Sequence, residues 1–372
     1  MRPLAILHVD PERGFGGGEV QVRGLVRHLA AAGQQQAIAA DPAGALFAEA
    51  ELGVARWPLR IRNSADVVAG RRLAGLLAHG GYDIVHFHTA RAHAMSVFLG
   101  RASPAVRVVT RRMDYPPRGG WYARWLYNET VDVVVAISEG VRAVLVSGGV
   151  EPTRIHVIPS GVEAERFVTS DVLRAEERGR RGIAADEFVV LVVAALEKRK
   201  GHGVLFEAVA MLPELRLRVF CAGSGSQAAA LARRRDELGL GAQVSFLGQV
   251  HDVRALLAAA DAVAVPSLQE GLGVAAIEAL AAGRPVIASR VGGLPEVIGE
   301  GVAGILVEPG DPAAFAAALR RLAGHPAAAR ALGEAGVARV RARFTMQGMA
   351  RATLELYRRL ARTSDARIEH AS

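Results

Sequence analysis

The 372-residue chain has a single cysteine, few aromatic residues and no long hydrophobic run. Because Cys221 has no second thiol to pair with, we expect no internal disulfide and a reducing compartment, the cytoplasm. The apolar run at the N-terminus is too short for a signal peptide. The longest near-continuous apolar stretch, Phe188 to Leu196, is far below the roughly 20 residues that span a bilayer, so any membrane contact should be peripheral.

Lysine is also scarce, since Lys198 and Lys200 are the only lysines among the 45 basic residues and the others are arginines. The net charge of +8 is divided equally between residues 1–167 and the rest of the chain. A nucleic-acid-binding module would gather its charge on one face, so this even spread argues against a nucleic-acid partner. The charge suits anionic substrates or an anionic membrane surface, although genome composition is the cause we favour for the abundance of arginine.

Short apolar, β-branched runs alternate with longer segments rich in Ala, Leu and Arg, which is typical of an α/β protein with a parallel sheet between helices. In the first half the expected strands are 4–9, 36–40, 84–87, 106–110, 131–137 and 155–158, and the expected helices are 20–32, 64–78, 92–100, 121–129 and 140–147. A second series runs from 188–194 to 314–322. Residues 168–187 are expected to connect the two series, and 345–361 form an amphipathic helix that needs a partner surface.

The most informative stretch lies between Asp261 and Pro295, where an apolar strand leads through a glycine-rich turn into a helix. The first turn of a helix offers unpaired N–H groups and a partial positive charge, which suit phosphate. Glu270 and Glu278 lie eight residues apart around this turn. Carboxylates repel phosphate but accept hydrogen bonds from sugar hydroxyls. The combination predicts a nucleotide-sugar site.

The pattern P-S-x-x-E-G-x-G-x-x-x-x-E-A-L-A-x-G-x-P-V-I-A, read from Pro266 to Ala288, resembles the retaining glycosyltransferases of family 4, which have the GT-B fold. The resemblance covers nearly the whole chain. It implies two Rossmann-like domains that face a cleft, and a C-terminal helix that crosses back to the first domain. We therefore expect an acceptor-binding domain at 1–167, a nucleotide-sugar-binding domain at 168–344, and the crossover helix and tail at 345–372.

The resemblance also implies roles for single residues. Glu270 would bind hydroxyls of the donor sugar, and Glu278 would bind the ribose hydroxyls. Lys200 and Arg199 would stabilise the departing diphosphate, which makes Glu270, Lys200 and Arg199 the expected catalytic residues. The other expected donor-binding residues are Gly16, Gly17, Gly18, Gly248, Val250, Gly271, Leu272, Gly273 and Val274.

Three adjacent cations, Lys198, Arg199 and Lys200, follow the first strand of the second series. Strand ends are where α/β sheets bind ligands, and positive charge there suits a diphosphate. The alternative is a solvated charged loop. The family usually reads G-R-L-x-x-x-K-G here; Lys200 matches its lysine, but Ala195 stands in place of its arginine. We expect Arg199 to supply the missing charge.

The glycine run Gly16–Gly18 follows the first strand and precedes a helix. Such a loop suits contact with phosphate or sugar, and its alternatives are a tight turn or a dinucleotide-binding fold. The spacing does not match G-x-G-x-x-G, which weakens the dinucleotide interpretation. Asp41, at the end of the second strand, keeps that interpretation open because an acid there can bind a ribose.

His86 and His88 lie at the end of an expected strand, and His93 follows in a helix. No acid or cysteine has ligand spacing nearby and there is no D-x-D motif, so we expect no metal site. Many family members have a histidine at the end of the following strand, where this chain has Arg112. An arginine cannot act as a base there, but it could hold an anionic group. His88, Arg111 and Arg112 are the residues we expect near the acceptor.

Five of the eight Trp and Tyr residues gather in one short segment. They are Tyr115, Trp121, Tyr122, Trp125 and Tyr127, interleaved with Arg118 and Arg124. Such a cluster could contact an anionic membrane or a glycolipid. A helix packed against the first sheet is the alternative that we favour slightly.

Together these features predict a metal-independent, retaining glycosyltransferase that uses a nucleotide-diphosphate sugar and no cofactor. A carbohydrate or lipid-linked acceptor of cell-envelope polysaccharide, lipopolysaccharide or glycolipid synthesis is implied by the resemblance. The expected location is the cytoplasm, at the inner face of the cytoplasmic membrane. The alternatives are a nucleotide-sugar epimerase of the same fold, an NAD-dependent oxidoreductase and a non-catalytic nucleotide-sugar-binding protein.

Overall fold

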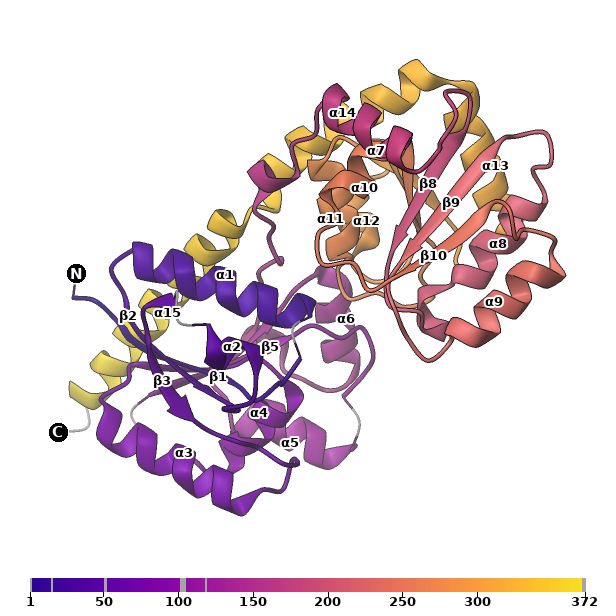
Figure 1. The fold of residues 1–372 in the computed structure, drawn as a ribbon. Coiled ribbons are helices and arrows are strands. Elements are labelled where there is room, and N and C mark those ends of the chain that lie inside the picture. Colours follow the sequence, from indigo (N-terminus) through magenta and orange to yellow (C-terminus); the bar gives the residue numbers. More distant parts are fainter. Residues whose placement is uncertain (1, 15, 50–51, 101–104, 118, 370–372) are drawn as a thin grey trace. The chain divides into compact units, whose positions relative to one another are not determined.

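The computed structural model describes residues 2–14, 16–49, 52–100, 105–117 and 119–369, with side chains described as far as Arg362 (Figure 1). The chain forms two compact units. Unit 1 comprises Met1–Gly161 and Met346–Ser372, and unit 2 comprises Val162–Thr345. Each unit has its own sheet and its own hydrophobic core.

Unit 1 contains a seven-stranded parallel sheet with the order β3-β2-β1-β4-β5-β6-β7. Its strands are β1 (Ala5–Asp10), β2 (Gln35–Ala40), β3 (Ala55–Pro58), β4 (Ile84–Phe87), β5 (Val106–Arg111), β6 (Val133–Ala136) and β7 (Ile155–Val157). Its helices are α1 (Gly17–Ala31), α2 (Ala45–Ala48), α3 (Val67–Gly80), α4 (Ala90–Ala94), α5 (Trp121–Glu129), α6 (Glu139–Ser147) and α15 (Met346–Glu369), with short 3-10 turns η2 (Met95–Phe98) and η3 (Pro152–Arg154).

Unit 2 contains a six-stranded parallel sheet with the order β10-β9-β8-β11-β12-β13. Its strands are β8 (Phe188–Val193), β9 (Leu217–Ala222), β10 (Val244–Gly248), β11 (Ala262–Val265), β12 (Val286–Ser289) and β13 (Gly304–Val307). Its helices are α7 (Asp171–Arg180), α8 (His202–Ala210), α9 (Ala228–Glu237), α10 (Arg254–Ala259), α11 (Val274–Ala281), α12 (Leu294–Ile298), α13 (Pro312–Gly324) and α14 (Pro326–Arg343), with 3-10 turns η4 (Ala164–Phe167) and η5 (Lys198–Lys200).

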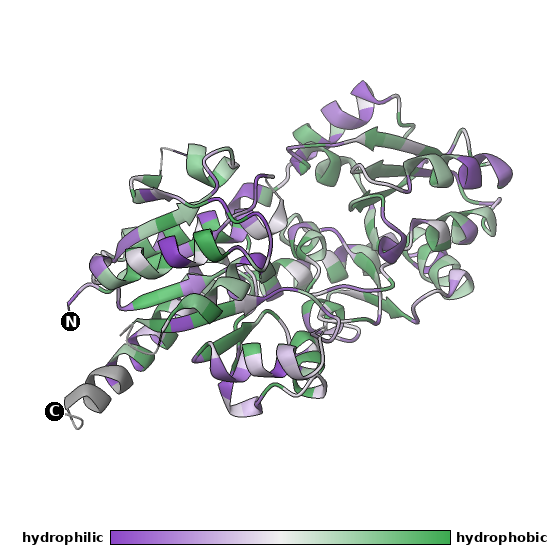
Figure 2. Ribbon diagram, turned by 90° about the horizontal axis from the view of Figure 1, so that it is seen from below, coloured by the Kyte–Doolittle hydropathy of each residue, from purple (hydrophilic) through white to green (hydrophobic). Residues whose placement is uncertain are grey.

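The composition of the strands explains why both sheets are covered on two faces. β6 reads VVVA and β8 reads FVVLVV, and nearly all of these side chains are buried. A strand that is apolar on both sides must be covered on both sides, which is the usual situation in parallel sheets. Figure 2 shows the strands of both units in the green of hydrophobic residues, whereas the helices alternate green with purple.

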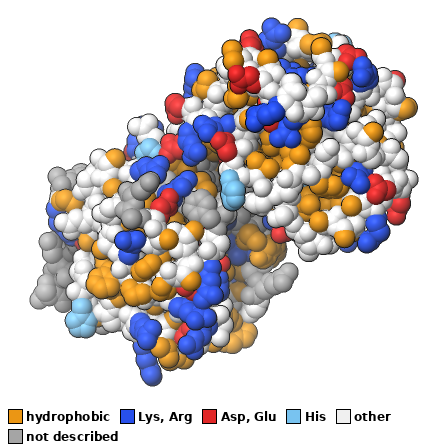
Figure 3. Space-filling view, in the orientation of Figure 1, with side chains coloured by type: hydrophobic (Ala, Val, Ile, Leu, Met, Phe, Trp, Pro, Cys, Tyr) orange, Lys and Arg blue, Asp and Glu red, His pale blue; other side chains and the backbone are white. Residues whose placement is uncertain are grey.

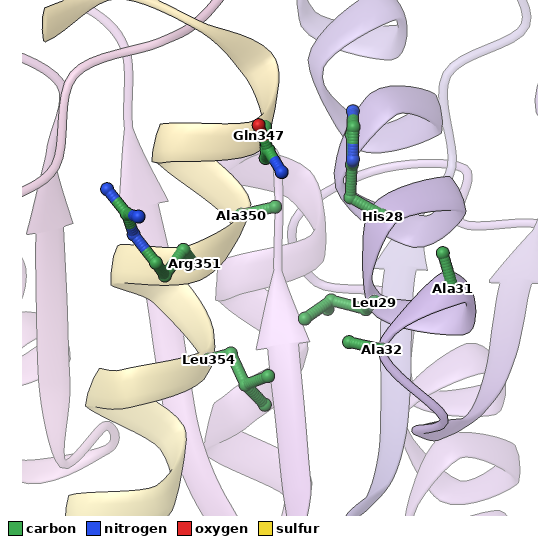
Figure 4. Close-up of a pocket in the computed structure, with 8 residues that line it drawn as sticks. All are labelled: His28, Leu29, Ala31, Ala32, Gln347, Ala350, Arg351 and Leu354. Carbon is green, nitrogen blue, oxygen red and sulfur yellow. The ribbon is translucent and has the colours of Figure 1, made fainter. Parts of the chain in front are cut away.

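The C-terminal helix α15 belongs to unit 1, which confirms the expected return of the chain to the first domain. Its apolar face packs in the core of that unit with Tyr357 fully buried, and it runs beside α1. A pocket of about 300 Å³ lies between the end of α1 and α15, and its lining includes His28 and Leu29 of α1 and Arg351 and Leu354 of α15 (Figure 4).

The segment expected to connect the two domains is different from the prediction. Within residues 168–187, Asp171–Arg180 form α7, which packs against α10 inside unit 2. Arg174 and Arg178 of this helix bind carbonyl groups at the end of α10 and the carboxylate of Asp261. The charged composition that suggested a linker therefore serves a helix held by ion pairs. The sequence also did not predict the strands β3 and β13 or the helices α2 and α14.

The strand orders place one switch point in each sheet. In unit 1 the chain leaves β1 toward β2 on one side and resumes with β4 on the other. In unit 2 the corresponding neighbours are β8 and β11. In open α/β sheets, ligands bind beyond the carboxyl ends of the strands at such a point. The fold therefore indicates two candidate ligand sites, one beyond β1 and β4 in unit 1 and one beyond β8 and β11 in unit 2.

No helix among the described residues is both long enough and apolar enough to cross a membrane. On the face shown in Figure 3, basic and acidic side chains are interspersed over both units.

Candidate active site

The carboxyl edge of the unit 2 sheet brings Lys200 and Glu270 together. Lys200 follows β8 and Glu270 follows β11, the two strands of the switch point. The Nζ atom of Lys200 lies 2.6 Å from Oε2 of Glu270, and both side chains are largely buried. The hydroxyl of Ser267 donates a second hydrogen bond to the same carboxylate oxygen, over 3.1 Å. An ammonium group has three N–H donors, so Lys200 can keep this pair and still bind an anion.

Backbone contacts fix the relative position of the two loops that carry this pair. Gly201 has a φ of +67°, and a Cβ there would lie 1.8 Å from the carbonyl oxygen of Pro266. Only glycine allows both the left-handed backbone and this close approach. The carbonyl of Arg199 accepts hydrogen bonds from the N–H groups of Leu268 and Gln269. The β8 and β11 loops are therefore held together independently of any ligand.

The side chain of Arg199 is turned toward its own loop. Its Nε atom donates to Oε2 of Glu197 over 2.7 Å, and both side chains are about two-fifths exposed. Ala195 leaves room in the same loop but contributes no charge. The role of Arg199 in diphosphate binding remains a prediction, and it requires that the side chain leave or share Glu197.

Helix α11 starts directly after the glycine-rich turn. Gly273 is its N-cap with a φ of +92°, and no side chain caps the helix. The N–H groups of Leu272, Gly273 and Val274 precede the first intrahelical acceptor, so this end of the helix is suited to phosphate.

Glu278 lies one turn further along α11. Burial raises the pKa of its carboxyl group to about 7, while Arg166 of η4 acts in the opposite direction. Among the described residues, its carboxylate has no hydrogen-bond or ion-pair partner. The side chain is half-buried, so its charged form is partly desolvated, and two hydroxyl groups of a ligand would stabilise that form by donating hydrogen bonds.

Gly248 and Val250 lie at and beyond the end of β10, at the same edge of the sheet. The carbonyl of Gly248 accepts a 2.7 Å hydrogen bond from the N–H of Gly223, and Ser224 donates to the side chain of Gln249. These turns form a backbone-lined border beside β8. Gly248, Lys200, Glu270 and the start of α11 therefore lie at one edge of the sheet, and their role in binding a donor stays a prediction.

The switch point of unit 1 carries a different set of residues. Asp10 ends β1, the Gly16–Gly18 turn opens α1, and Arg112 follows β5. The N–H of Gly16 donates to Oε2 of Glu19 over 2.7 Å, so the side chain of Glu19 caps the start of α1. A Cβ on Gly18 would lie 3.8 Å from Nε of Arg112, so the glycine turn and the guanidinium group are neighbours.

Burial dominates the electrostatics of this edge. It raises the pKa of Asp10 to about 7, with a further contribution from Glu19. Nε of Arg112 is buried and has no hydrogen-bond partner, and the nearest charges that stabilise this cation are Asp10 and Glu19. Arg112 is thus placed to hold an anionic group.

A cluster of three buried histidines lies beneath this edge, and the sequence revealed only two of them. His8 of β1 and His86 of β4 are register partners, and His88 follows on the same side. One ring nitrogen from each lies within 4.8 Å of the others. Sequence spacing could not reveal His8, because it comes from a strand that is distant in the chain.

Hydrogen bonds already occupy most of these ring nitrogens. Nδ1 of His8 lies 3.0 Å from Nε2 of His88, and its Nε2 lies 3.1 Å from Gln36. His86 contacts the hydroxyl groups of Tyr357 and Thr110, at 2.5 and 2.7 Å. Burial lowers the pKa of all three imidazoles, so they are neutral. A metal ion would have to displace this network.

Two other residues named from the sequence have structural partners. Arg111 donates to the carbonyl of Tyr115 over 2.7 Å and lies against the Tyr115 ring. Asp41 accepts hydrogen bonds from Arg13 and from the N–H of Ala43. Asp41 is therefore already engaged, which weakens the dinucleotide interpretation.

The aromatic segment presents three of its rings to solvent. Trp121, Tyr122 and Trp125 are 73%, 39% and 41% exposed and contact one another edge to face or tilted. Only Tyr127 is buried, where it packs against His93. The packing alternative favoured from the sequence is therefore wrong for the two tryptophans. Arg118 lies outside the described residues.

Comparisons with known proteins agree with this fold. The family described as glycosyl transferases group 1 matches residues 174–339, and Glycosyltransferase Family 4 matches residues 15–166. The D-inositol 3-phosphate glycosyltransferase of Mycobacterium tuberculosis is 33% identical over 330 residues, which cover 82% of this chain and 68% of that protein. Anabaena HepE in complex with UDP has a TM-score of 0.85 at 22% identity, over 95% of this chain and 99% of that one. Sucrose-phosphate synthase from Thermosynechococcus elongatus has a TM-score of 0.81 at 26% identity, over 96% and 99%.

Proposed function

Because the chain belongs to the group 1, or family 4, glycosyltransferases, we propose that it transfers a sugar, with retention of configuration, from a nucleotide-diphosphate sugar to an acceptor hydroxyl group. The observation that carries this proposal is the Lys200–Glu270 pair at the switch point of unit 2, beside the uncapped start of α11. One edge thereby offers a cation for phosphate and a carboxylate for hydroxyl groups.

In this mechanism the diphosphate lies at the start of α11, where Lys200 and backbone N–H groups balance its charge. Glu270 binds hydroxyl groups of the donor sugar, and Glu278 binds those of the ribose. The acceptor attacks on the face from which the diphosphate leaves. The departing phosphate oxygen takes the acceptor proton, so neither a separate base nor a metal ion is required.

We propose uridine as the base of the donor, because a similar fold binds UDP in the Anabaena protein. For the acceptor we propose a carbohydrate, a phosphorylated polyol or a lipid-linked sugar of the cell envelope. The inositol phosphate acceptor named for the mycobacterial relatives and the unpaired guanidinium of Arg112 both favour an acceptor that carries negative charge.

We further propose peripheral contact with an anionic membrane at the cytoplasmic face. The exposed Trp121, Tyr122 and Trp125 support it, because aromatic rings of this kind partition into the headgroup region. Arg124 is exposed on the same helix and would add electrostatic attraction.

A panel of nucleotide-diphosphate sugars, screened by thermal protection, tests the proposal. One nucleotide sugar should raise the melting temperature more than its free sugar, and incubation with inositol 3-phosphate or an envelope glycan should release the nucleoside diphosphate. A nucleotide sugar that is consumed without an acceptor and yields its epimer would identify the epimerase instead. Protection by NAD alone would identify the oxidoreductase. Protection without turnover on any acceptor would favour the non-catalytic binder.

A further inference from the structure

Unit 2 has a second polar pocket at the opposite edge of its sheet. It measures about 600 Å³ and lies where the strands begin: Phe188 opens β8, and Asp261 and Pro285 directly precede β11 and β12. Lys200 and Glu270 lie at the other end of the same strands. The pocket is therefore separate from the donor edge. Its volume lies within the roughly 300–1,000 Å³ of small-molecule sites.

Arginine side chains dominate the charge of this pocket. Arg174, Arg284 and Arg330 line it, against Asp171 and Asp261. Arg174 is committed elsewhere, because it binds three successive carbonyl groups at the end of α10 as well as Asp261. Asp261 is shared between Arg174 and Arg178. The charges left for a ligand are Arg284 and Arg330, opposed by the exposed Asp171.

Arg284 is the residue that most clearly lacks a partner. Its Nε atom is buried without a hydrogen-bond acceptor, and its Nη2 atom makes only a long 3.2 Å bond to the hydroxyl of Thr169. Burial lowers its pKa to about 10; the neighbouring Arg174 contributes in the same direction, whereas Asp261 and Asp171 act in the opposite one. A guanidinium group that is desolvated beside another one is stabilised by any anion that reaches it.

The start of α14 adds a second source of positive potential. Pro326 and Ala329 of its first turn line the pocket, and this 18-residue helix has no side-chain cap. Pro326 has no N–H group and the N–H of Ala329 donates to the carbonyl of His325, so this end of the helix acts through its dipole, which favours an anion. Phe188 and Leu322 supply an apolar wall, which a bare inorganic ion would not need.

From these features we infer that the pocket between α7, α14 and the amino edge of the unit 2 sheet binds a phosphate ester of a small organic molecule. Its phosphate group lies between Arg284 and the start of α14, and its organic part contacts Phe188 and Leu322. The site differs from the donor site in position and in residues. Figure 1 shows α7 and α14 close together at this end of unit 2.

Calorimetric titration with glucose 6-phosphate at low ionic strength tests the inference, with glucose as the neutral counterpart. The wild type should bind the phosphate ester and not glucose. Arg284→Gln should weaken binding by roughly tenfold or more, the scale of one charge-assisted hydrogen bond. Arg320→Gln is the matched control, because this arginine is exposed on α13 and paired with Glu214, and its binding should equal that of the wild type.

Lys200→Ala separates the pocket from the donor edge and should leave this binding unchanged. Loss of binding in Lys200→Ala, wild-type binding in Arg284→Gln, equal binding of glucose, or no binding of the ester would each overturn the inference. If Arg284→Gln does not fold, Arg330→Glu decides, since Arg330 is exposed. That charge reversal should weaken binding at least about tenfold, and undiminished affinity would again overturn the inference.

Discussion

The carboxyl edges of the two sheets differ in how their charged side chains are paired. In unit 2 the important cation and anion, Lys200 and Glu270, are already paired at 2.6 Å. In unit 1, Arg112 has a buried Nε atom without an acceptor, its nearest stabilising charges are Asp10 and Glu19, and burial raises the pKa of Asp10 to about 7. The paired edge is preorganised for a ligand that carries both phosphate and hydroxyl groups. In unit 1 the Nε atom of Arg112 leaves a donor that an anionic group could accept.

The largest expected effect comes from the paired edge. Lys200→Ala should lower kcat by about a hundredfold or more, because it removes a stabiliser of the leaving group and leaves Glu270 without its cation. Steady-state kinetics with the nucleotide sugar identified by thermal protection provide the measurement. Lys198→Ala is a matched control two residues away, with an exposed side chain, and should behave like the wild type. Equal loss in both variants would mean that the loop acts only as diffuse charge.

Glu270→Gln should separate the sugar from the nucleotide. The amide keeps the shape of the side chain but loses its charge, so hydroxyl groups of the donor sugar are held less firmly. We expect kcat to fall by roughly tenfold to a hundredfold, while the affinity for the nucleoside diphosphate changes little. Calorimetry with the nucleoside diphosphate and with the complete nucleotide sugar separates an effect on sugar binding from an effect on nucleotide binding. An equal loss of affinity for both ligands would contradict the assignment of Glu270 to the sugar.

Arg199→Ala should have a smaller effect, since the side chain is about two-fifths exposed and paired with Glu197. If Arg199 compensates for Ala195, kcat should fall roughly threefold to tenfold, more than for a surface substitution. The double variant Ala195→Arg with Arg199→Ala sharpens the test, because it restores the family pattern and should recover activity. Wild-type kinetics for Arg199→Ala would show that this arginine is only a solvated loop charge.

The smallest effect on catalysis is expected from the aromatic surface. Replacing Trp121 and Trp125 with Ser should abolish sedimentation with anionic liposomes at low salt, and it should leave the melting temperature nearly unchanged because both rings are exposed. Transfer to a water-soluble acceptor should also be retained. The membrane role would be contradicted if the wild type did not sediment with anionic liposomes, or if the double variant lost several kcal/mol of folding stability.

Features formed by residues that are close together in the sequence could be predicted, whereas features formed by residues that are far apart could not. The strand, turn and helix around Glu270 and Glu278 lie within one short segment, so the sequence alone predicts them. The Lys200–Glu270 pair joins residues 70 positions apart, and only the strand order places them side by side.

Other features stayed hidden for the same reason. His8 belongs to the histidine cluster only because β1 pairs with β4. The charged residues of α7 predict a solvent-exposed linker. In the structure two of its arginines instead bind Asp261 and a carbonyl group at the end of α10. The exposure of Trp121 and Trp125 could not be deduced either, since an amphipathic helix does not reveal which of its rings finds a partner.

The central claim is that the carboxyl edge of unit 2 binds the nucleotide sugar with Glu278 on its ribose. The pKa of this buried carboxyl group is raised to about 7, so the group is partly protonated in the free protein at neutral pH. Hydroxyl donors stabilise the ionised form, so binding should lower this pKa and release a proton. The affinity should then rise about tenfold from about pH 6 to about pH 8.

Calorimetry across this pH range, with the nucleotide sugar found by thermal protection, is the most direct measurement. A nucleotide sugar has no phosphate group that titrates here, so the slope reports on the protein. For the wild type the account predicts that affinity rises with pH and that binding releases a proton. Glu278→Gln should lose both effects, and its affinity at high pH should be lower by roughly tenfold or more. Glu334→Gln, a change at an exposed glutamate of α14, should retain them. Equal affinity and an equal pH slope in the wild type and in Glu278→Gln would contradict the account.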